Sequence, residues 1–70
     1  MTPAQKAAID RYFVDLNSVR DSFQLYLSED KIRGALMLLS DTGELTREEY
    51  SKYDNHLLSE VRRIEEEKGF

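Results

Sequence analysis

Residues 40–50 read SDTGELTREEY, and this stretch carries a signal that ends a helix followed at once by one that starts a helix. Gly43 can adopt the left-handed backbone conformation that often closes a helix. Thr46 is a favoured N-cap residue, and Glu49 follows it at the spacing of a capping box, in which each residue satisfies a backbone amide of the other. The stretch therefore predicts a tight turn between two helices.

The segments on both sides of this turn have apolar residues at helical spacing. Beyond the turn, such residues recur every three or four positions until Gly69, which predicts a helix that starts at Thr46 and stops at that glycine. Before the turn, Ser28 is another N-cap candidate and predicts a helix that ends near residues 40–42. Because the turn is short, we expect these two helices to lie antiparallel.

The first part of the chain predicts one long helix. Thr2 suits the N-cap, Pro3 suits the first helical position, and Gln5 completes a second capping box. The apolar residues that follow are spaced alternately three and four apart, as in a heptad seam. We therefore expect a helix over residues 3–27, with Asn17-Ser18 as the one place where a separate helix could open instead.

Together these signals predict an all-α fold in a single domain over residues 1–70. It would consist of a long N-terminal helix followed by an antiparallel helical hairpin, packed as a three-helix bundle. Met37 and Leu38 make the second helix apolar around much of its circumference, so we expect this helix to be the buried centre of the fold.

The long first helix also predicts self-association. At 1.5 Å per residue it would measure roughly 37 Å, against about 18 Å for the second helix. Its uncovered seam would be buried most simply against a second copy, so we expect a homodimer. The candidate interface residues are Ile9, Tyr12, Leu16, Val19, Phe23, Tyr26, Tyr50 and Tyr53. Aromatic residues at helical spacing are also typical of a core, so both interpretations of these rings stay open.

The composition bounds the classes of partner. Fourteen acidic residues against ten Lys and Arg give a net charge of −4. Such a surface repels phosphates at long range, so we expect no direct nucleic-acid binding. No apolar run approaches the roughly 20 residues that span a bilayer, and the N-terminus lacks the pattern of a signal peptide. We therefore expect a cytoplasmic protein that does not contact a membrane.

The residues that could carry chemistry are few. The chain has no cysteine and one histidine, His56, so neither a disulfide nor a multi-histidine metal site can form. A calcium-binding loop with Gly43 as its sixth residue and Glu49 as its twelfth would begin at Leu38, which offers no oxygen ligand. No motif places a nucleophile beside His56. We expect no catalytic residue, no metal and no cofactor, and the protein is not predicted to be an enzyme.

Residues 36–61, LMLLSDTGELTREEYSKYDNHLLSEV, resemble the short C-terminal domain (SHOCT) family. Members have a leucine-rich helix, a short turn with glycine, and a second helix that begins with threonine and a glutamate–aromatic pair. The matching positions here are Leu38, Leu39, Gly43, Leu45, Thr46, Glu48, Glu49, Tyr50, Leu57 and Leu58. The resemblance implies a helical hairpin used for association, without catalytic residues.

These features favour a non-enzymatic interaction module, a small acidic helical protein that binds and modulates a partner protein. The alternative is an acidic inhibitor of a nucleic-acid-handling machine, such as a phage-type anti-defence factor. A single exposed acidic stripe would favour the inhibitor, and mixed charges would favour the interaction module. The stripe would consist of Glu48, Asp54, Glu60, Glu65 and Glu67. A helix-turn-helix DNA-binding protein would need a basic recognition helix, whereas the third helix has more acidic than basic residues.

Overall fold

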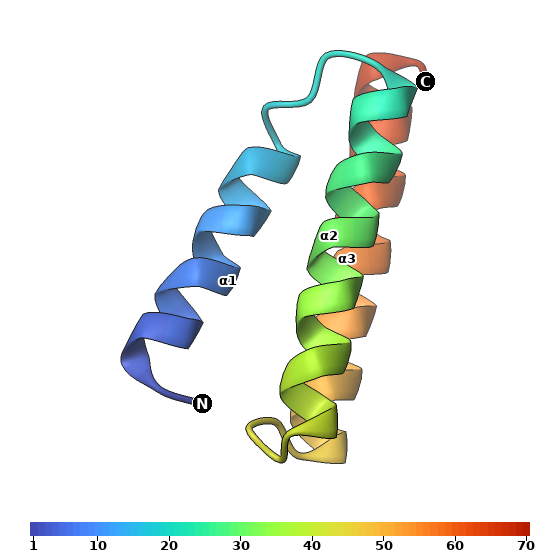
Figure 1. Cartoon of the computed structure of the whole chain (residues 1–70). Coiled ribbons are helices and arrows are strands. Elements are labelled where there is room, and N and C mark those ends of the chain that lie inside the picture. The colour runs from blue at the N-terminus through green and yellow to red at the C-terminus, as the bar shows by residue number, and fades with distance from the viewer.

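The computed structural model describes all 70 residues and contains three α-helices and no strand (Figure 1). They are α1 (Pro3–Leu16), α2 (Ser22–Asp41) and α3 (Arg47–Lys68). α2 and α3 form an antiparallel pair along most of their length, and α1 packs mainly against α2. The predicted all-α class with three helices is confirmed.

The prediction of one helix over residues 3–27 is wrong, because α1 ends at Leu16. The break begins at Asn17, where the sequence allowed an interruption. The Asn17 side-chain amide donates to the carbonyl of Phe13 at 2.9 Å, and the Ser18 hydroxyl donates to the carbonyl of Val14 at 3.3 Å. Both carbonyls also accept from the Asn17 amide, at 3.3 and 3.1 Å, so side chains and backbone together satisfy the end of α1.

The second helix also begins earlier than predicted. Asp21, not Ser28, is the N-cap of α2, and its carboxylate accepts a hydrogen bond from the Gln24 amide at 2.8 Å. Ser28 therefore lies inside α2. Because the break at residues 17–21 interrupts the apolar repeat, α2 starts with a new rotational phase and buries Leu25 completely. Leu25 has no place in the continuous seam predicted for the first helix.

The core is small and wholly apolar. Ten residues are buried, and none of them is polar or charged. They are Ile9, Leu16, Val19, Leu25, Ile32, Leu36, Leu45, Leu57, Val61 and Ile64. Half-buried aromatic residues close its edges, among them Phe13, whose ring centroid lies 6.5 Å from that of Tyr53. A chain this short buries a modest share of its surface, so these ten side chains carry most of the apolar stabilisation.

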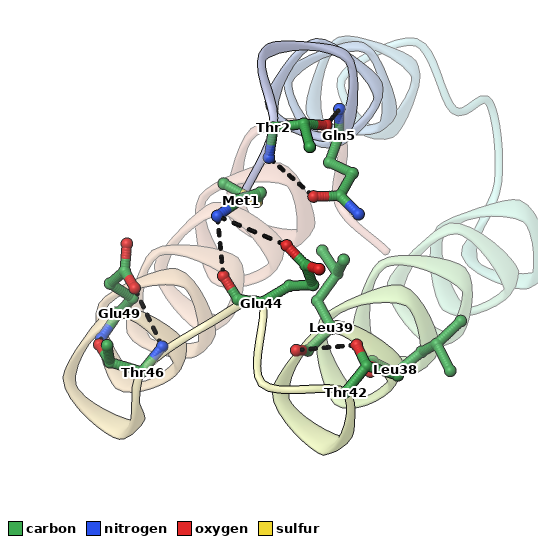
Figure 2. Close-up of polar contacts among 9 residues, drawn as sticks. All are labelled: Met1, Thr2, Gln5, Leu38, Leu39, Thr42, Glu44, Thr46 and Glu49. Atoms are coloured by element: carbon green, nitrogen blue, oxygen red, sulfur yellow. Dashed lines mark hydrogen bonds and ion pairs between the residues drawn. The ribbon is translucent and has the colours of Figure 1, made fainter.

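The turn between α2 and α3 has the predicted chemistry (Figure 2). Gly43 has a φ of 79°, the left-handed region that glycine tolerates. The Thr46 hydroxyl accepts from the Glu49 amide at 3.1 Å, and the Glu49 carboxylate accepts from the Thr46 amide at 2.9 Å. The Met1 amino group donates to the Glu44 carbonyl at 3.0 Å, which fastens the start of α1 to this turn.

Candidate interaction surface

The structure does not gather the eight predicted interface residues into one surface. Ile9, Leu16 and Val19 are core residues and are therefore not available to a partner in this fold. The tyrosines at positions 12, 50 and 53 are half-buried and pack against the core. Phe23 and Tyr26 are exposed, and both belong to α2.

The seam that required a second copy is also absent. The expected homodimer rested on a first helix that projects beyond its neighbours, whereas α1 has 14 residues and the other helices have 20 and 22. The residues of the predicted seam that lie on α1 are covered by the chain itself: Ile9 and Leu16 are buried, and Tyr12 is half-buried. Self-association would therefore require another surface.

Exposed apolar side chains gather instead on α2. Of the seven large apolar residues that are exposed, α2 contributes five, and Val14 and Leu58 are the other two. Phe23 is 70% exposed, and Leu27, Met37 and Leu38 are at least half exposed. The expectation that Met37 and Leu38 lie in a buried centre is therefore wrong. α2 does contact both other helices, but two neighbours leave its third side uncovered.

We call this uncovered side the α2 outer face. It consists of Phe23, Leu27, Asp30, Gly34, Met37, Leu38 and Asp41. All seven are exposed, and successive members are three or four residues apart, except that Met37 and Leu38 are adjacent. At 3.6 residues per turn these positions lie opposite Leu25, Ile32 and Leu36, which face the core. A shallow apolar hollow between α1 and α2, lined by Ala8, Ala35, Leu38 and Leu39 among others, adjoins the α2 outer face through Leu38.

The charges on the α2 outer face are negative and unpaired. Asp30 and Asp41 are exposed, and neither forms an ion pair or a side-chain hydrogen bond within the chain. The two basic residues of α2, Lys31 and Arg33, are engaged elsewhere. Lys31 lies over the ring of Tyr12 at 4.4 Å, and Arg33 pairs with carboxylates on its other side, at 3.1 and 3.8 Å. The face therefore combines apolar area with two carboxylates that have no partner.

The acidic residues of α3 do not form the stripe that would favour an inhibitor. Glu60 and Glu67 both bind Arg63, at 2.7 and 3.0 Å, and the hydrogen bond from Arg63 lowers the pKa of Glu60. Glu48 lies 3.6 Å from Lys52.

The other two members of the predicted stripe face α2. Asp54 lies 3.8 Å from Arg33, and Glu65 accepts a hydrogen bond from the Tyr26 hydroxyl at 3.3 Å. The charge of Glu65 raises the pKa of Tyr26. Asp54 and Glu65 therefore lie on one flank of α3 and Glu60 and Glu67 on the other, and four of the five carboxylates pair with Lys or Arg.

No three His, Asp or Glu side chains are grouped so that they could hold a metal ion. The ring of His56 packs against Phe13 with centroids 4.8 Å apart, and its Nε2 lies 4.0 Å from Glu60. None of the three helices has the length and apolar character needed to cross a membrane.

Compared with models of known protein families, with curated proteins and with solved structures, the chain matches none of them. The resemblance of residues 36–61 to the SHOCT family therefore stays a prediction. The α2 outer face is the candidate site, and its residues are the basis for assigning a function.

Proposed function

We propose that this protein is a non-enzymatic protein–protein interaction module that binds and modulates a partner protein through the α2 outer face. The observation that carries the proposal is the concentration of Phe23, Leu27, Met37 and Leu38 on one uncovered side of a single helix. Exposed large apolar side chains gathered on one face in this way are typical of interaction sites.

The energetics of such a surface are sufficient for binding. Fully burying one Leu, Phe or Met side chain contributes about 1.5–3 kcal/mol. Association costs roughly 4–15 kcal/mol in lost translational and rotational freedom. Phe23, Leu27, Met37 and Leu38 are 50–70% exposed in the free chain, so their burial contributes only part of these values. It can offset a cost near the lower end of that range, and two paired carboxylates would add to the balance.

The proposal does not extend to an acidic inhibitor of a nucleic-acid-handling machine. Such an inhibitor would present its negative charge as a continuous surface in place of a nucleic-acid backbone. Four of the five carboxylates of the predicted stripe on α3 are instead paired with basic side chains. This arrangement supports the interaction module over the alternative.

Site-specific photo-crosslinking in the organism that encodes the chain tests the proposal. A photoreactive phenylalanine analogue would replace Phe23 or Leu38 on the α2 outer face. Matched controls would carry it at Asn55 or Arg62, which are exposed on α3. We expect a discrete protein adduct from the two α2 positions and none from the α3 positions. Equal adducts from both helices, or no adduct from α2, would contradict the proposal.

A further inference from the structure

Gly34 lies in the middle of α2, where no contact within the chain requires a glycine. Its φ is not positive, unlike those of Gly43 and Gly69. A Cβ atom built at Gly34 would meet nothing within 4 Å. A glycine inside a helix lowers the stability of the helix relative to alanine. The fold therefore carries an unfavourable residue at a position where almost any other side chain would fit.

Gly34 is also the centre of the α2 outer face. Leu27 and Asp30 precede it, and Met37, Leu38 and Asp41 follow it on the same side of the helix. Because Gly34 has no side chain, the backbone of α2 is uncovered at this point of the face. The distance between packed helices depends on the side chains at their contact, so a glycine at the crossing point permits close approach. A partner helix that crosses here would explain why a glycine occupies this position.

The unpaired carboxylates define the charge of that partner. Asp30 lies one turn before Gly34 and Asp41 two turns after it, so both would flank the crossing helix. A carboxylate that enters an interface without a partner loses its hydration at a cost. Lysine or arginine on the incoming helix would remove this cost and form charge-assisted hydrogen bonds. Met37 adds a flexible side chain that can adapt to the apolar residues of the partner.

A second copy of the chain does not satisfy these charges. If two α2 helices paired in parallel at Gly34, each Asp30 would face Asp30 and each Asp41 would face Asp41. If they paired antiparallel, residues equally far from Gly34 would meet, so Asp30 would face Leu38 and Asp41 would face Leu27. The first arrangement opposes like charges, and the second places carboxylates against apolar side chains.

From these observations we infer that the α2 outer face binds an amphipathic helix of another protein, which carries lysine or arginine among its apolar residues and crosses α2 at Gly34. This inference rests on the proposed function and specifies the chemistry of its partner. Binding of an amphipathic helix through apolar anchors three and four residues apart is a common mode of peptide recognition.

Three synthetic helical peptides test the inference. Each would have about 18 residues, the length of helix that spans Phe23 to Asp41, and the same stripe of leucines. Their polar positions would be lysine, glutamine or glutamate. Fluorescence anisotropy would give the affinities for the whole chain, and amide chemical shifts would locate the bound peptide. We expect the lysine peptide to bind roughly tenfold more tightly than the glutamine peptide, and the glutamate peptide to bind least.

Variants then assign the binding to this surface. Gly34→Leu should fold well, because leucine favours helices and has open space there, but it should weaken binding of the lysine peptide at least about tenfold. Ser59→Leu, an equivalent change at an exposed position of α3, should leave binding unchanged. Asp30→Asn should reduce the preference for lysine over glutamine, and Glu48→Asn should not.

The inference is overturned if the Gly34→Leu variant binds the lysine peptide as tightly as the wild type does, or if the three peptides bind equally. It is also overturned if the amide chemical shifts that change on peptide binding belong to α3. It is also overturned if the α2 outer face pairs with a second copy in solution. The proposed function fails separately, when crosslinks do not form at Phe23 and Leu38. Crosslinks at those positions without a preference for the lysine peptide would leave the interaction module standing and reject the basic helix.

Discussion

Two glycines of this chain occupy opposite backbone environments, and their substitution should have opposite effects on stability. Gly34→Ala should raise the free energy of unfolding by about 1 kcal/mol, because alanine favours the helix and its Cβ meets no neighbour. Gly43→Ala should lower it by roughly 1–2 kcal/mol, because φ is 79° there. Urea unfolding followed by circular dichroism measures both. A loss of stability in Gly34→Ala would show that glycine is needed within the chain itself.

The ionised carboxylate of Glu49 should make stability depend on pH. The hydrogen bond from the Thr46 amide lowers the pKa of Glu49 in the folded state. A depressed folded-state pKa contributes stability at pH values above the ordinary Glu pKa, and this contribution is lost as the pH falls through the folded-state value. Glu49→Gln should therefore lose less stability than the wild type between neutral pH and about pH 3.

Glu48→Gln is the matched control for this measurement. Glu48 is the neighbouring residue, and its carboxylate lies near Lys52 and makes no hydrogen bond to the amides at the start of α3. Urea midpoints compared across the acid range should follow the wild type in this variant. Identical pH profiles for Glu49→Gln and the wild type would contradict the assigned role of the capping box.

At the scale of the helices, the start of α3 could be predicted from sequence, whereas a break at Asn17-Ser18 could be named only as an alternative to a continuous helix. The turn around Gly43 and the capping box depend on residues close together in the chain, so their pattern is visible in the sequence. The segment after α1 is held in part from a distance. Lys68 donates to the carbonyl of Val19, and the Arg63 side chain binds Asn17. No local pattern reveals contacts with the far end of α3.

The break decides which face of α2 is buried, and three substitutions in that helix test it. Leu25 is fully buried, so Leu25→Ala should cost about 2–5 kcal/mol of stability. Phe23→Ser and Leu27→Ala replace exposed residues, so each should change stability by no more than about 0.5 kcal/mol. Urea unfolding gives all three values.

A continuous helix over residues 3–27 would predict the reverse order, with Phe23 in the seam. A large loss of stability in Phe23→Ser together with a small loss in Leu25→Ala would therefore contradict the break. The break also explains why little of the α2 outer face could be predicted from sequence. Of the residues of the α2 outer face, only Phe23 was among the predicted interface residues. Leu27, Met37 and Leu38 could not be recognised, because their exposure depends on the rotational phase with which α2 starts after the break.

For the molecule as a whole, we expect a monomer in the absence of its partner. The long seam that favoured a homodimer does not exist, since α1 ends at Leu16 and its seam residues Ile9, Tyr12 and Leu16 are buried or half-buried. The remaining apolar surface carries Asp30 and Asp41, and each chain has a net charge of −4. Both the local and the overall charge oppose pairing of two copies.

Sedimentation equilibrium at several protein concentrations measures the mass directly. At moderate salt we expect 8.2 kDa throughout the micromolar range. High salt screens the repulsion between chains, so any weak self-association should increase there. If the mass is twice this value at moderate salt, Leu27→Lys should decide which surface is responsible. If this change dissociates the dimer, a second copy of the chain binds the α2 outer face. That result would contradict the inference that the face binds a basic helix of another protein.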